Sequence, residues 1–200
     1  ILGEPGDIAE GLLDVLALKP GNVGVHGAGH GMRAVDFVRS ARAAATAIAA
    51  EGASVGILDA DIYGPSQPAM LGISDRPETP DGKSLLPMRK YDLQAMSVGF
   101  LIDVETPMIW RGPMVMSALS QMLKDVAWGE LDVLVVDMPP GTGDAQLTMA
   151  QQVPLAGVVI VSTPQDLALI DARKGLNMFR KVNVPVLGVT LWSREIASGA

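Results

Sequence analysis

Residues 132–144 read DVLVVDMPPGTGD, and this segment decides the fold. Four consecutive apolar residues, Val133 to Val136, end in Asp137 and are followed by a loop rich in proline and glycine. A buried helix can produce such a run, but its short length and the acidic residue that ends it favour a strand. Near-continuous apolar strands are typical of a parallel sheet that is covered on both faces.

The rest of the chain alternates between similar strands and amphipathic helices. The predicted strands are Asn22–His26, Ser54–Asp59, Leu93–Phe100, Val133–Asp137, Gly157–Ser162 and Val186–Val189. The predicted helices are Val35–Glu51, which ends before Gly52, then Val115–Val126 and Asp166–Arg180. This alternation predicts an α/β fold with a three-layer α/β/α arrangement and a mostly parallel sheet. The segment Gly64–Lys90 is rich in proline and glycine, so we expect a long functional loop there.

Composition excludes several classes of protein. The chain has 200 residues, of which 48% are hydrophobic and 18% charged, so it is not a disordered protein. It contains no cysteine, which excludes a disulfide scaffold and any thiolate-held zinc or iron–sulfur site within these residues. The net charge of −7 argues against a broad nucleic-acid-binding face. No apolar run reaches the ~18 residues that span a bilayer, so we expect no membrane partner. From the charge we expect no nucleic-acid partner, and we expect a cytoplasmic location.

Acidic residues follow two of the predicted strands, at the edge where α/β sheets bind ligands. Asp137, at the end of its strand and before a glycine-containing loop, has the Walker B arrangement, in which the carboxylate holds Mg²⁺ through water. The alternative is that Asp137 only caps the loop that follows it. Asp59 and Asp61 lie two residues apart, so one faces the site and orients a water molecule, unless both belong to a solvated turn.

The glycine loop after the first predicted strand lacks the usual phosphate-binding lysine. A Walker A loop reads G-x-x-x-x-G-K-[ST], but no lysine occurs between Lys19 and Lys83. Gly27, Gly29 and Gly31 remain as backbone donors for phosphate. Residues 29–34 also fit the dinucleotide pattern G-x-G-x-x-A, with Asp59 as a ribose partner farther along the chain than that pattern requires. A metal site at His26 and His30 is the weakest alternative.

The segment from Ala49 to Val189 resembles the Mrp/ApbC family of iron–sulfur cluster carrier ATPases, in the deviant-Walker ParA/MinD group of P-loop NTPases. The matching motifs are ILDADIYGPSQP at 57–68, WRGPM at 110–114, DVLVVDMPPGTGD at 132–144 and STPQ at 162–165. The resemblance implies ATP hydrolysis with Mg²⁺, a homodimer, and transfer of a [4Fe–4S] cluster to recipient apo-proteins.

The resemblance also implies roles for individual residues. Asp61 would be the switch I carboxylate that orients the attacking water, and Asp137 the Walker B group that holds Mg²⁺. Residues Gly141, Thr142 and Gly143 would form the switch II backbone. Together with these three, we expect the nucleotide to be bound by Gly27, Gly29, Gly31, Asp59 and Pro164. The implied organisation is an N-terminal segment at 1–21, a P-loop NTPase-like domain at 22–190 and a divergent tail at 191–200.

The chain departs from the family pattern at both ends. Both lysines of the family's phosphate loop are absent, and the cluster-binding C-x-x-C has no counterpart before Ala200. We therefore expect an iron–sulfur carrier with impaired hydrolysis; the alternatives are a non-hydrolysing member that acts by partner binding and a Rossmann-type dinucleotide binder. Because the resemblance fades around Ala47 and stops after Val189, we hypothesise that the flanks 1–46 and 190–200 are out-of-frame translations. A chain that starts at Ile1 rather than Met is also expected to be a fragment.

Overall fold

The fold is built on one sheet, seen in a computed structural model that describes residues 21–27, 34–102, 112–139, 141, 147–148, 150–151 and 153–191. The strand order is β3-β4-β2-β5-β1-β6-β7. All pairings are parallel except that of β3 with β4. The strands are β1 (Gly21–Gly27), β2 (Val55–Asp59), β3 (Met88–Lys90), β4 (Leu93–Ser97), β5 (Val133–Met138), β6 (Leu155–Ser162) and β7 (Val186–Leu191). This confirms the predicted α/β fold with a mostly parallel sheet.

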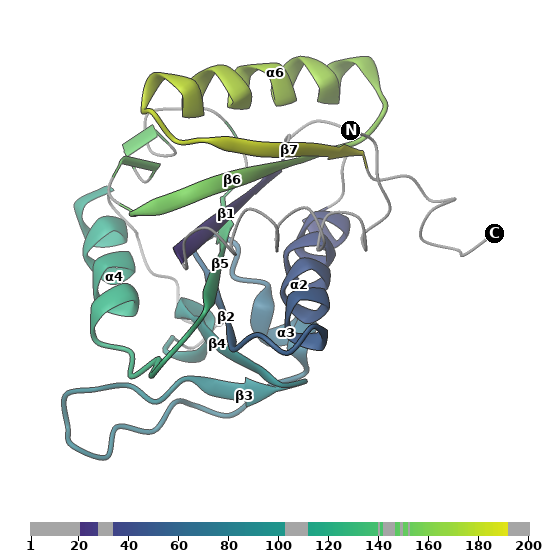
Figure 1. Ribbon diagram of the computed structural model, residues 1–200. Helices are drawn as coiled ribbons and strands as arrows, with labels where there is room; N and C mark the ends of the chain where they lie inside the picture. Colours follow the sequence, from purple (N-terminus) through teal and green to yellow (C-terminus); the bar gives the residue numbers. More distant parts are fainter. Residues whose placement is uncertain are drawn as a thin grey trace.

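Helices cover the sheet on both sides. In Figure 1, α2 (Ala34–Ala50) and α4 (Gly112–Lys124) lie on opposite sides of the central strands, and α6 (Asp166–Lys181) packs along β6. Helix α2 ends as its sequence predicts, because Gly52 has φ +93° and its N–H donates to the Ala49 carbonyl at 2.9 Å. None of the described helices combines the length and the apolarity needed to cross a membrane.

Two local predictions are wrong. The predicted strand Leu93–Phe100 stops at Ser97, because the Ser97 hydroxyl accepts a hydrogen bond from the Gly99 N–H and starts a 3₁₀ turn, η1 (Val98–Phe100). The predicted loop Gly64–Lys90 contains a short helix, α3 (Gln67–Leu71), and the edge strand β3. Both elements are stabilised by contacts with distant parts of the chain, which local sequence patterns do not show.

The strand order also distinguishes between two nucleotide-binding folds. In the Rossmann fold the first and second strands are neighbours. Here β5 lies between β2 and β1, and β2 pairs with β4 on its other side. The Rossmann alternative is therefore wrong, and the strand that carries Asp137 lies next to the strand that leads into the glycine loop.

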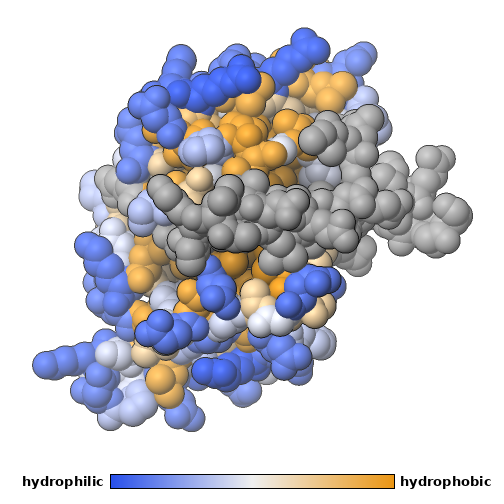
Figure 2. All heavy atoms as spheres, in the orientation of Figure 1, coloured by the Kyte–Doolittle hydropathy of each residue, from blue (hydrophilic) through white to orange (hydrophobic). Residues whose placement is uncertain are grey.

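The core lies on both faces of the central strands. Every residue of β2 and β5 is buried, in agreement with their continuous apolar sequences. Figure 2 shows polar residues on the outer surface over α6 and around the β3 hairpin, with hydrophobic residues between them. The buried acidic residues at the ends of β2 and β5 stand out against this apolar core, since carboxylates are almost never fully buried without partners.

Candidate functional site

Asp59 and Asp137 lie side by side at the carboxyl ends of neighbouring strands. They are register partners in the parallel pair β2–β5, and the Ala60 N–H donates to the Asp137 carbonyl at 2.9 Å. The two residues are 0% and 2% exposed. The sheet thus brings together two of the acidic residues that the sequence analysis selected, at the edge where such sheets bind ligands.

The carboxylate of Asp59 organises the loop that follows β2. Its Oδ2 accepts hydrogen bonds from the Ser66 and Gln67 N–H groups at 2.9 and 3.0 Å and from the Ser97 hydroxyl at 3.0 Å. Its Oδ1 accepts one from the Asp61 N–H at 3.2 Å. Burial raises the pKa of Asp59 from 3.8 to about 6, against the opposing effect of these hydrogen bonds. With both oxygens engaged, Asp59 serves here to fold the loop back over the sheet.

Asp61 lies farther out on the same loop. Its side chain is partly exposed, and its Oδ1 accepts a hydrogen bond from the Gly64 N–H at 3.1 Å. Partial burial raises its pKa above the ordinary value, and backbone hydrogen bonds from Gly64 and Tyr63 lower it. The two acidic residues therefore differ in exposure, since Asp59 is buried and Asp61 is partly exposed. Residues two apart on a strand share a face, so strand alternation does not explain this difference; β2 ends at Asp59, and Asp61 lies in the loop beyond it.

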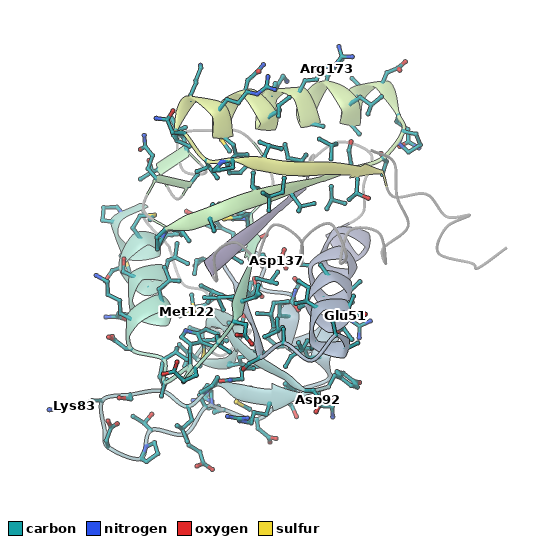
Figure 3. The ribbon with its side chains drawn as sticks, in the orientation of Figure 1. Glu51, Lys83, Asp92, Met122, Asp137 and Arg173 are labelled. Atoms are coloured by element: carbon teal, nitrogen blue, oxygen red, sulfur yellow. The ribbon has the colours of Figure 1, made fainter. Side chains whose placement is uncertain are left out.

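Asp137, labelled in Figure 3, is almost fully buried, as is Asp59. Its Oδ2 accepts a hydrogen bond from Gln67 Nε2 at 2.7 Å, while its Oδ1 is buried and has no partner among the described residues. Burial raises the pKa of Asp137 well above its ordinary value, the charges of Asp59 and Asp61 raise it further, and the Gln67 hydrogen bond lowers it. Asp137 is therefore a buried carboxylate with one oxygen left for a ligand.

Gln67 is a site residue that the sequence analysis missed. It is 0% exposed, and it donates to Asp59 through its backbone N–H and to Asp137 through its side-chain Nε2. Its side-chain oxygen, Oε1, is buried and has no hydrogen-bond partner among the described residues. The only local signal was its place in the Ser66-Gln67-Pro68 sequence, where a proline at the first turn marks a helix start. That signal predicts α3 but does not show what the Gln67 side chain contacts.

The remaining predicted site residues lie at the same edge or outside the described residues. Gly27 ends β1 beside β5 and β6. Gly141 follows β5 with φ +104°, a conformation that favours glycine, and Pro164 is exposed just after β6. Outside the described residues lie Gly29, Gly31, Thr142 and Gly143, and also His30 of the alternative metal site.

The described residues fit a hydrated magnesium ion rather than a directly coordinated metal. No group of three or more His, Cys, Asp or Glu residues that could hold a metal occurs in the part of the chain that the structure describes. Instead, two buried oxygens, Asp137 Oδ1 and Gln67 Oε1, have no hydrogen-bond donor within the described residues. Mg²⁺ keeps several of its waters and is held in nucleotide sites through one or two carboxylates, so water molecules of such an ion would supply those donors.

This strand order, with a buried aspartate on the strand beside the glycine loop, defines a P-loop NTPase, and the solved structures agree. A nucleotide-binding protein in complex with ADP from Archaeoglobus fulgidus is 33% identical, with a TM-score of 0.72 over 92% of this chain and 70% of that chain. The MinD cell division protein of Aquifex aeolicus, at 19% identity and a TM-score of 0.53 over 89% of this chain and 72% of that one, shares the fold.

Within this class, the chain belongs to the ParA family, whose model is described as the NUBPL iron-transfer P-loop NTPase and matches residues 38–191. The match confirms the resemblance to iron–sulfur carriers and begins before Ala47, where we expected the resemblance to fade. A second model, for CitG, an ATP:dephospho-CoA triphosphoribosyl transferase, matches only residues 11–62.

Curated relatives carry the same functional description. The iron-sulfur cluster carrier protein of Pseudomonas fragi is 63% identical over 72% of this chain, and that of Escherichia coli K12 is 50% identical over 94%. The iron-sulfur cluster transfer protein NUBPL of Mus musculus is 50% identical over 90%. The chain spans 51%, 48% and 54% of these three proteins, about half the length of each.

Proposed function

We propose that this chain is the nucleotide-binding core of an iron–sulfur cluster carrier, which binds ATP with Mg²⁺ and passes its cluster to recipient apo-proteins. The observation that carries the proposal is the buried Oδ1 of Asp137, which has no hydrogen-bond partner in the described part of the chain and lies at the carboxyl edge of a P-loop NTPase sheet. Its supports are the family membership of residues 38–191 and the described function of the relatives.

In this proposal, Asp137 holds the magnesium ion of the nucleotide through a water molecule. When bound, the ion neutralises the negative charge of the phosphates. Asp137 accepts the hydrogen bond of the bridging water at Oδ1, while Gln67 holds its Oδ2 at 2.7 Å. Asp61 is the carboxylate that orients a water molecule toward the terminal phosphate, because it is the more accessible of the two acidic residues after β2.

The remaining contacts of the nucleotide are proposed from the family pattern. Backbone N–H groups of Gly27, Gly29 and Gly31 surround the phosphates, and those of Gly141, Thr142 and Gly143 approach the terminal phosphate. Pro164 borders the nucleotide from the loop after β6. We assign Asp59 to the same site, where its four hydrogen bonds hold the loop that presents Asp61.

The iron–sulfur cluster is the cargo of this proposed carrier. The 200 residues contain no cysteine, so thiolate ligands for a [4Fe–4S] cluster come from outside them. We propose a homodimer in the cytoplasm, as the family resemblance implies.

The absent lysines favour binding over turnover. Positively charged groups that contact the transferred phosphoryl group stabilise the transition state by several kcal/mol. The segment between Lys19 and Lys83, which contains the glycine loop, has no lysine that could make this contact. We therefore propose impaired hydrolysis. The second candidate function is that of a family member that does not hydrolyse ATP and acts by binding a partner. The absence of lysine between Lys19 and Lys83 favours this candidate too.

Binding of a fluorescent ATP analogue with and without Mg²⁺ tests the nucleotide site. We expect Mg²⁺ to increase the affinity of the wild-type chain for the ATP analogue. In Asp137→Asn, which lacks the carboxylate charge, the factor by which Mg²⁺ increases the affinity should be at least tenfold smaller. The matched control is Asp75→Asn, since Asp75 is an exposed aspartate outside the proposed site. If Mg²⁺ has no effect on wild-type affinity, or if both variants respond alike, Asp137 does not hold the ion.

A further inference from the structure

Helix α6 leaves two large aliphatic side chains on its outer surface. Leu167 is 64% exposed and Ile170 is 48% exposed, and because they are three residues apart they are neighbours on the helix surface. The residues that the same turns bury are small, Ala168 and Ala172. In an amphipathic helix the apolar stripe faces the core and the opposite face is polar. The core of this chain therefore does not account for Leu167 and Ile170.

The second half of α6 carries exposed basic residues. They are Arg173, Lys174, Arg180 and Lys181, and the acidic residues of the whole helix are Asp166 and Asp171. Lys174 Nζ pairs with Asp171 Oδ1 at 3.1 Å, whereas the other three basic residues form no ion pair with any residue that the structure describes. Figure 3 shows Arg173 on the outer side of α6, away from the sheet. The helix is thus positively charged in a chain of net charge −7.

The aliphatic and the basic residues share one face of the helix. Side chains three or four residues apart lie on the same side, and Ile170 is followed at such steps by Arg173, Asn177 and Arg180. From Leu167 to Lys181 the helix rises about 21 Å at 1.5 Å per residue. We call this surface the α6 outer face; it consists of Leu167, Ile170, Arg173, Lys174, Arg180 and Lys181. It is apolar at the end that follows β6 and basic at the other end.

The charge of the α6 outer face indicates an acidic partner, and the charge of the whole chain favours a protein over a lipid surface. An anionic membrane also attracts basic amphipathic helices, but it extends beyond the helix and repels the rest of a chain whose net charge is −7. A protein segment that contacts only α6 meets its positive charge alone. Two exposed aliphatic side chains are also few for insertion into a bilayer, whereas they suffice to anchor one helix.

We propose that the α6 outer face binds an acidic amphipathic helix of a partner protein. Apolar residues of that helix, three and four positions apart, pack against Leu167 and Ile170. Its carboxylates lie beside the basic residues of the second half of α6, and this charge complementarity sets the orientation of the partner and speeds association. An interface confined to one helix face is small, so the complex is a transient one. The proposal does not depend on nucleotide binding.

The test is an NMR titration of the ¹⁵N-labelled full chain with two synthetic peptides of about 14 residues, long enough as helices to cover α6 from Leu167 to Lys181. One peptide has Leu at positions three and four apart and Glu at the others, and the second has Gln in place of Glu. We expect the acidic peptide to shift the amide signals of α6. The Gln peptide should bind at least tenfold more weakly, because it has no charge to pair with the basic residues.

Two double variants test the two halves of the α6 outer face. Leu167→Ser with Ile170→Ser, and Arg173→Glu with Arg180→Glu, should each weaken binding of the acidic peptide at least tenfold. Their melting temperatures should stay close to the wild-type value, because the replaced side chains are exposed.

Matched controls replace side chains of the same kinds elsewhere. Leu86→Ser removes an exposed aliphatic side chain, and Lys83→Glu reverses an exposed charge that lies far from Arg173 in Figure 3. Both should bind the acidic peptide as the wild type does. Asp137→Asn should also bind it normally even if nucleotide binding is lost, so the two proposals can fail separately.

Several results would overturn the proposal. They are an absence of binding by the acidic peptide, equal binding of the two peptides, and amide shifts confined to residues outside 166–181. Binding to vesicles of phosphatidylcholine and phosphatidylserine without binding of the acidic peptide would assign the surface to a membrane instead. Shifts of the α6 amides that grow with the concentration of the chain alone would assign it to a second copy.

Discussion

Gln67 and Asp137 are 70 positions apart in the chain and are joined by a buried hydrogen bond of 2.7 Å from Nε2 to Oδ2. The Gln67 backbone N–H also donates to Asp59 at 3.0 Å. One residue thus connects the loop after β2 to the carboxylate at the end of β5. A movement of Gln67 away from β5 would therefore break the hydrogen bond to Asp137, the residue that we propose holds Mg²⁺.

Gln67→Leu should destabilise the fold by about 1.5–3 kcal/mol, because it deprives a buried carboxyl group of its only hydrogen bond from the described residues. Urea denaturation at pH 7 measures the free energy of unfolding. The control is Gln121→Leu on the exposed face of α4, for which we expect a change within about 0.5 kcal/mol. Equal effects of the two substitutions would mean that the hydrogen bond contributes nothing to stability.

Stability should fall as the pH rises from about 4 to about 7. The pKa of Asp59 is about 6 in the folded chain and 3.8 for the free group, so the folded state binds more protons in this range. The free energy of unfolding then decreases with pH, by about 3 kcal/mol for this group at 1.36 kcal/mol per pKa unit. The raised pKa values of Asp61 and Asp137 act in the same direction.

Denaturation at a series of pH values checks this, with Asp59→Asn as the comparison. The variant loses acceptor capacity for its hydrogen bonds and should be less stable at every pH, but its stability should depend less on pH. A wild-type stability that rises between pH 4 and pH 7 would show that Asp59 ionises normally in the folded chain.

Gly56→Ala should cost about 1–3 kcal/mol of stability through overpacking. A Cβ at this position of β2 would lie 2.7 Å from Leu131 Cδ1, 2.8 Å from Leu134 Cδ1 and 3.2 Å from Trp128 Cε3. Gly112→Ala is the matched control, because a Cβ there meets nothing within 4 Å at the start of α4. Thermal unfolding compares the two; a smaller loss for Gly56→Ala than for Gly112→Ala contradicts the packing argument.

ATP turnover by this chain should be near background. The proposed carboxylates Asp61 and Asp137 are present, but no lysine lies between Lys19 and Lys83 to stabilise charge on the transferred phosphoryl group. A phosphate-release assay should give rates for the wild type and for Asp137→Asn that differ less than tenfold. A wild-type rate like that of an intact P-loop ATPase would show that another group replaces the lysine.

Much of the fold could be predicted from the sequence, because each buried parallel strand has its own apolar run. The strand predicted at Val133–Asp137 extends to Met138, and the one predicted at Gly157–Ser162 begins two residues earlier, at Leu155. The predictions failed at the 3₁₀ turn after Ser97, at α3 and at β3. The 3₁₀ turn depends on the hydrogen bond between the Gly99 N–H and the Ser97 hydroxyl, whereas α3 and β3 depend on hydrogen bonds to Asp59 and to β4. Hydrophobic periodicity records none of these bonds.

By itself, the sequence determined the class of fold, the strand ends that carry Asp59, Asp61 and Asp137, and the absence of cysteine and of a Walker A lysine. These follow from residue type and local pattern. Only the tertiary structure decided that both carboxylate oxygens of Asp59 accept hydrogen bonds, that Gln67 donates to Asp137, and that Asp137 Oδ1 has no partner among the described residues. The physical reason is that burial and hydrogen-bond satisfaction depend on which distant groups the parallel pairing of β2 with β5 brings together.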